Sequence, residues 1–156
     1  MNHASADDEL ELRWGKELFN RVWTLLEMER RSSDDDAEMI HAVHASCCHW
    51  RHVGQPVHFA RGEWQCSRVY STLGRSEPAL FHAKRCLTLC TDNGIGDFDL
   101  AFAYEALARA YAVAGDRDEA ARWEALARSA AVDIGDDDDR ELVLSDLSTL
   151  PEPAGD

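Results

Sequence analysis

The sequence lacks the long apolar run, the excess of positive charge and the nucleotide-binding motifs that mark several common classes of protein. No stretch approaches about 18 consecutive apolar residues, so we expect no membrane-spanning helix. Acidic residues outnumber basic ones by 30 to 16, and a net charge of −14 repels nucleic acid and anionic membranes. The sequence contains no glycine-rich phosphate loop and no Gly-x-Ser-x-Gly elbow. We therefore expect neither nucleic acid nor membrane as a partner, no cofactor, and no enzymatic activity.

Features of secreted proteins are missing as well. The first residues are polar and then acidic, without the basic and apolar segments of a signal peptide. Five cysteines, two of which (Cys47 and Cys48) are adjacent, do not form the even set typical of a disulfide framework. These observations predict free thiols and a cytoplasmic location.

Apolar residues at helical spacing fill most of the chain, and no segment shows the alternation of a strand. Glycine, proline and capping residues separate the apolar segments. The sequence predicts one all-α domain over residues 8–150, with residues 1–7 disordered and residues 151–156 forming a flexible tail. The expected helices are 8–31, 37–53, 57–74, 76–92, 97–114, 117–133 and 138–150.

Residues in the second half of the chain repeat at a spacing of 41. Tyr70 and Gly74 recur as Tyr111 and Gly115, and further pairs share the same spacing. A repeated helical unit cannot bury its apolar face alone, so it stacks on its neighbours. Glycine at the repeated turn gives the backbone freedom that a tight helix–helix connection needs. The further pairs are Ala60 with Ala101, Arg68 with Arg109, and Ala79 with Ala120.

The repeated units resemble the tetratricopeptide repeat. The stronger match places Leu107, Ala108, Tyr111, Gly115 and Ala120 at the family's offsets, and the unit before it matches less fully. The usual repeat has 34 residues, so this one, with a spacing of 41, resembles a variant of the family with longer repeats. The resemblance implies three antiparallel helical hairpins over residues 8–53, 57–92 and 97–133, with a capping helix over 138–150. It also implies a non-enzymatic module that binds a protein or peptide partner.

In this family the first helix of each hairpin lines a concave groove. Carried over by register, the resemblance implies a groove containing three arginines and two large aromatic side chains, which suits a peptide with acidic and apolar residues or a free carboxylate. The alternative is that the arginines pair locally with Glu63 or Glu105. The implied groove residues are Arg61, Trp64, Arg68, Phe102, Glu105 and Arg109.

A second hypothesis for the function is metal binding or sensing, because histidine and cysteine share one face of the predicted helix 37–53. The ends of that face lie about 16 Å apart along the helix axis, so one ion would need ligands from another helix, such as His58 or His82. The residues of this face are His41, His44, Cys48 and His52.

The repeat offers a simpler interpretation of several of these residues. His41, His82 and Trp123 follow the 41-residue spacing, which favours packing between repeats for both histidines. Cys86 aligns with Ala127 by the same spacing, and we expect Cys66, Cys86 and Cys90 to be small core residues. A third hypothesis is self-assembly, for example as a homodimer, because short arrays have open ends.

Overall fold

The computed structural model describes residues 5–152, which form seven α-helices and no strand. The all-α prediction is thereby confirmed. Among the described residues no helix is both long and apolar enough to cross a membrane. The helices are α1 (Ala6–Leu26), α2 (Ser33–Val53), α3 (Pro56–Thr72), α4 (Ser76–Asp92), α5 (Asp97–Ala114), α6 (Arg117–Val132) and α7 (Asp137–Leu147).

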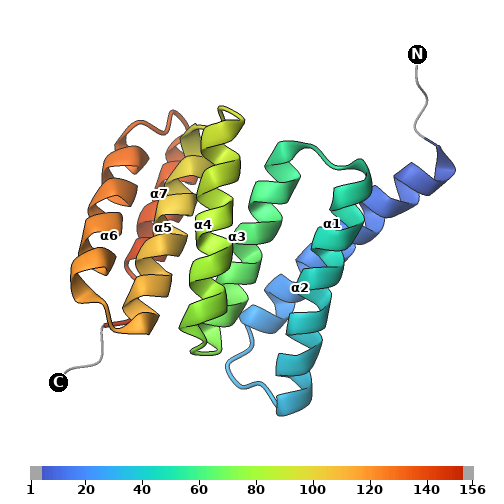
Figure 1. Ribbon diagram of the computed structural model, residues 1–156, viewed down its shortest axis with the longest axis horizontal. Coiled ribbons are helices and arrows are strands. Elements are labelled where there is room, and N and C mark those ends of the chain that lie inside the picture. The colour runs from blue at the N-terminus through green and yellow to red at the C-terminus, as the bar shows by residue number, and fades with distance from the viewer. Residues whose placement is uncertain (1–4, 153–156) are drawn as a thin grey trace.

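The helices pack as three successive hairpins, α1–α2, α3–α4 and α5–α6, and α7 lies against α5 and α6 (Figure 1). The hairpins follow one another along the long axis of the molecule, from the blue N-terminal pair to the orange pair (Figure 1). The predicted hairpin ranges and the predicted cap agree with this order. Because α3 contacts both α1 and α5, the first helices of the hairpins form one continuous layer.

The first helix begins earlier than the sequence predicts. Ser5 caps it through a reciprocal pair of hydrogen bonds with Asp8, and Ala6 is already helical. The predicted disordered segment 1–7 is therefore wrong for residues 5–7, and residues 1–4 lie outside the described residues. At the other end, residues 151–152 have no regular structure, and the rest of the predicted tail lies outside the described residues.

The two repeated turns have the same geometry. Gly74 and Gly115 adopt positive φ angles of 71° and 79°, the left-handed region that favours glycine. The next amide in each turn donates to the carbonyl of Tyr70 at 2.9 Å and of Tyr111 at 3.0 Å. The prediction that these glycines close the hairpins is confirmed.

Small side chains allow close approach of the helices. Ala79, Ala127 and their neighbours are buried, and so are Cys66, Cys86 and Cys90, as the core prediction required. Two glycines, Gly15 and Gly62, lie inside α1 and α3, within the predicted helices 8–31 and 57–74. A Cβ atom on Gly15 would come within 2.3 Å of the Trp50 ring, so this position sets the distance between α1 and α2.

Candidate functional site

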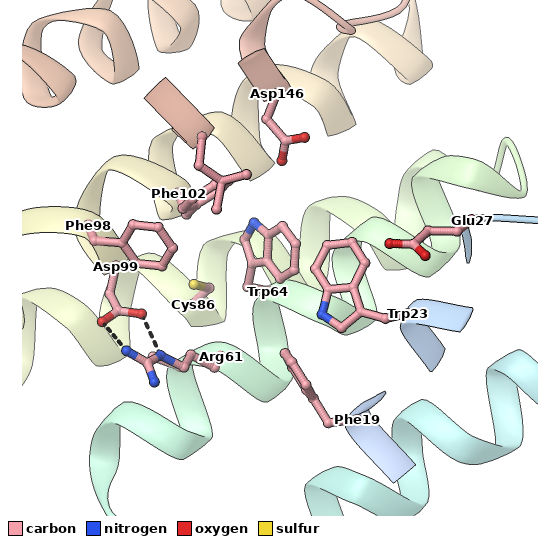
Figure 2. A pocket seen from close by; sticks show the side chains of 12 residues that line it. Phe19, Trp23, Glu27, Arg61, Trp64, Cys86, Phe98, Asp99, Phe102 and Asp146 are labelled. Atoms are coloured by element: carbon pink, nitrogen blue, oxygen red, sulfur yellow. Dashed lines mark hydrogen bonds and ion pairs between the residues drawn. The ribbon is translucent and has the colours of Figure 1, made fainter. Parts of the chain in front are cut away.

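A cavity of about 620 Å³ opens between α1, α3, α5 and α7 (Figure 2). Its lining is mainly apolar, and its five aromatic rings come from three different hairpins. We call it the aromatic cavity. Its lining residues are Phe19, Trp23, Glu27, Ala60, Arg61, Trp64, Cys86, Phe98, Asp99, Phe102, Leu142 and Asp146.

Trp64 is the central ring of this cavity. Its centroid lies 5.4 Å from that of Trp23 and 5.4 Å from that of Phe102. Its Nε1 is buried and has no hydrogen-bond partner among residues 5–152. The indole nitrogen is on the side of the ring that faces Phe102 and Asp146 (Figure 2). A buried donor without an acceptor costs about 1–3 kcal/mol, so an acceptor that reaches Nε1 after a small shift of the covering atoms gains that free energy.

The charged residues of the cavity are mostly paired within the protein. Arg61 donates from Nε and Nη2 to the two carboxylate oxygens of Asp99, at 2.8 and 3.1 Å. These hydrogen bonds raise the pKa of Arg61. Glu27 is exposed at the rim and forms no ion pair with another described residue. The rim therefore carries acidic charge that is available to a ligand.

Arg68, Glu105 and Arg109 form an ion cluster beneath α7. Nε of Arg109 donates to Oε1 of the fully buried Glu105 at 2.7 Å, and Nη2 of Arg68 lies 3.4 Å from the same oxygen. Arg68 also pairs with Asp146 of α7. Arg109 donates further to the carbonyl oxygens of Asp146 at 2.9 Å and Thr149 at 3.2 Å.

Half of the six predicted groove residues therefore line the aromatic cavity. They are Arg61, Trp64 and Phe102. For Arg68 and Arg109 the contacts follow the alternative of local pairing, since both bind Glu105. Glu63, the other predicted partner, instead contacts His82 and Arg85.

Sequence reasoning missed the contributions of α1 and α7 to this site. Phe19 and Trp23 lie in a hairpin that carries little of the repeat signature, and Leu142 and Asp146 lie in the capping helix. Their helical spacing indicated a buried face but did not indicate which helices would meet there. Only the packing of α7 over α5 brings the C-terminal residues to the cavity.

The predicted metal-binding face of α2 does not gather as one site. Only one of its four residues, His44, is partly buried and lies near other residues that could bind a metal. The possible ligand atoms of His44, Cys66 and His82 all lie within 4.8 Å of one another. His82 is one of the two residues from another helix that the sequence suggested. The other three residues of the face are exposed: His41, Cys48 and His52.

Each histidine of this group is held by a polar partner. Nε2 of His44 lies 2.8 Å from the Tyr70 hydroxyl, and Nδ1 of His82 lies 2.6 Å from Oε2 of Glu63. Burial, together with the charge of His82, lowers the pKa of His44 and favours its neutral form. The hydrogen bond with Cys47, and then burial, raise the pKa of the Cys66 thiol.

The packing prediction holds for one of the two histidines. His82 stacks on Tyr70 with ring centroids 5.8 Å apart. His82 also contacts Glu63. The residues 41 positions further on, Trp123 and Tyr104, also contact each other, through stacked rings. For His41 the packing prediction is wrong because its side chain is exposed on α2.

Exposed apolar residues lie near the start of α1. Leu10 and Trp14 are 46% and 41% exposed. Nothing in the described part of the chain covers them, and homodimer formation stays a prediction.

No protein-family model, curated protein or solved structure matches this chain.

Proposed function

We propose that the protein is a non-enzymatic binding module and that the aromatic cavity is its ligand site. The observation that supports this proposal is a cavity of about 620 Å³ lined by rings from several helices, with the unpartnered N–H of Trp64 beside it. Such a concave apolar site with few polar groups is typical of ligand pockets. The likeness to tetratricopeptide arrays belongs to the same proposal, supported by the recurrence of the glycine turns after 41 residues.

The contacts of the cavity define the chemistry of the ligand we propose. The aromatic lining suits one large apolar side chain, and the Trp64 N–H suits a peptide carbonyl next to it. Arg61 is neutralised by Asp99, whereas Glu27 carries an unpaired charge. With a net charge of −14 for the whole chain, these charges favour a peptide whose apolar residue has basic neighbours. This replaces the acidic peptide that the sequence suggested, because Arg68 and Arg109 are occupied by Glu105.

A single anchor of this kind gives modest affinity. Burial of one large apolar side chain stabilises a complex by about 1.5–3 kcal/mol, and part of the gain is offset by ordering the peptide. With a further gain of about 1–3 kcal/mol from an acceptor at the Trp64 N–H, we expect dissociation constants of about 0.1–10 mM for a short peptide. This range is accessible to calorimetry and to tryptophan fluorescence.

Blocked five-residue peptides test the proposal. We expect the peptide with a central phenylalanine between two arginines to bind best, and its counterparts with flanking glutamates or a central alanine to bind about tenfold more weakly or not at all. Leu142→Arg should abolish binding because Leu142 is 52% exposed and lines the cavity. Leu144→Arg is the matched control, since Leu144 is also exposed on α7 but does not line the cavity. Equal binding by the two variants would contradict the proposed site.

A further inference from the structure

Ligating side chains from three helices meet between α2, α3 and α4. His44 of α2, Cys66 of α3 and His82 of α4 each offer one ligand atom, and these atoms lie within 4.8 Å of one another. We propose that this cluster binds a divalent transition-metal ion, and Zn²⁺ is the ion that suits its ligands best. Imidazole and thiolate are the ligands that zinc prefers.

Cys47 is the candidate for a fourth ligand, although its Sγ lies outside the group whose ligand atoms are all within 4.8 Å of one another. Its Sγ lies 3.6 Å from Sγ of Cys66. With zinc–sulfur bonds of about 2.3 Å, two thiolates on a tetrahedral ion lie about 3.8 Å apart. The observed separation is therefore close to the one that zinc requires. Cys47 and His44 also stand three residues apart on α2, on the same side of the helix. Once Cys47 moves closer to the two histidines, the set is two cysteines and two histidines, the composition of closed structural zinc sites.

The remaining ligand distances require a small contraction. Nitrogen and sulfur ligands of one zinc ion lie about 3.3–3.8 Å from one another, whereas the ligand atoms of the cluster reach separations of up to 4.8 Å. Movement of the two half-buried histidine side chains by about 1 Å closes this difference for His44, Cys66 and His82. His44 and His82 are both only partly buried, so their rings have room for this adjustment.

The Glu63 carboxylate already holds one ring nitrogen of His82, one of the proposed ligands. Oε2 of Glu63 holds Nδ1 of His82 at 2.6 Å, and Oε1 accepts from Nε of Arg85 at 2.9 Å. A carboxylate that fixes one ring nitrogen leaves the other, Nε2, to face an ion. This arrangement is typical of histidines that bind metals, and it forms here without any adjustment of the helices.

A second cavity lies beside the cluster, next to Cys47 and Glu63. This cavity of about 590 Å³ is lined by Cys47, Glu63 and Gly62, among others. A Cβ atom on Gly62 would come within 2.9 Å of Sγ of Cys47. Glycine at this position therefore leaves space for the thiol between α2 and α3.

Cobalt and zinc titration of the full chain under reducing conditions tests the site. We expect one Co²⁺ ion per chain, with a thiolate-to-cobalt charge-transfer band that one equivalent of Zn²⁺ removes. Cys66→Ala and His82→Gln should each abolish the band, and Cys47→Ala should weaken zinc binding by about tenfold or more. Tyr70→Phe should retain the band, because the Tyr70 hydroxyl contacts His44 without being a ligand.

Matched controls separate this cluster from surface binding. Cys90→Ala removes an equally buried thiol, and His41→Ala removes an exposed histidine from α2; both should bind cobalt like the parent protein. Circular dichroism checks that every variant keeps its helices. The proposal is overturned if the parent protein binds no stoichiometric ion, or if the band survives Cys66→Ala and His82→Gln.

Discussion

Arg109→Met should destabilise the protein more than any exposed arginine substitution. Arg109 contacts the fully buried Glu105 at 2.7 Å and donates to Asp146 in α7 and to Thr149 just after it. Methionine preserves the bulk of the side chain but leaves Glu105 with only the 3.4 Å contact to Arg68. Loss of one partner of a buried ion pair costs about 3–5 kcal/mol. We expect the free energy of unfolding to fall by about that amount, a large share of the roughly 5–15 kcal/mol of a typical domain.

Urea unfolding followed by circular dichroism measures this loss. The double variant Glu105→Leu with Arg109→Met should recover at least about 2 kcal/mol of it, because an apolar pair leaves no buried charge without a partner. Arg128→Met is the control, since Arg128 pairs with Glu124 on the surface and should cost less than about 1 kcal/mol. A loss for Arg109→Met no greater than that of the control would refute the reasoning.

Three further predictions concern single residues in helices or turns. Gly15→Ala should lower the free energy of unfolding by about 1–3 kcal/mol in urea, since its Cβ would overlap the Trp50 ring. Gly115→Ala should cost about 1 kcal/mol in the same assay, because its φ of 79° strains any side chain. Nδ1 of His58 accepts the Gln55 amide at 2.8 Å, and burial, then the charge of Arg61, lower the pKa of His58. Its folded-state pKa is thus below the unfolded value of about 6.5. The unfolded chain takes up the proton first as pH falls, so stability is lost below about pH 6.5; His58→Gln should reduce that loss between pH 7.5 and 5.5.

The sequence was sufficient for the fold because its signals are local. Gly74 and Gly115 mark turns whose geometry depends on their own φ angles, and helical spacing of apolar residues marks each buried face. The start of the first helix was missed because Ser5 and Asp8 form a capping box that the acidic composition of the segment obscured.

The candidate site was only partly predictable because it depends on contacts between distant segments. Register along the repeat identified Trp64 and Phe102, which line the cavity. The same register placed Arg68 and Arg109 in an open groove, since nothing in the repeat indicates that Asp146 of the capping helix pairs with Arg68.

The metal cluster shows the same limit. The sequence grouped histidines and cysteines along one helix, whereas the structure brings His44 together with Cys66 and His82 of the next two helices. Helical periodicity shows which residues of one helix share a face, but it does not show which residues of other helices meet that face.

The indole N–H resonances of the five tryptophans offer the most direct test of the aromatic cavity as the binding site. Each signal is assigned by a tryptophan-to-phenylalanine variant, and the blocked peptide with phenylalanine between arginines is then added. Our account predicts that the signals of Trp23 and Trp64, which line the cavity, shift together with a single dissociation constant. The signals of Trp14, Trp50 and Trp123 should stay in place. Unchanged signals from Trp23 and Trp64 at saturating peptide, or equal shifts at all five positions, would contradict it.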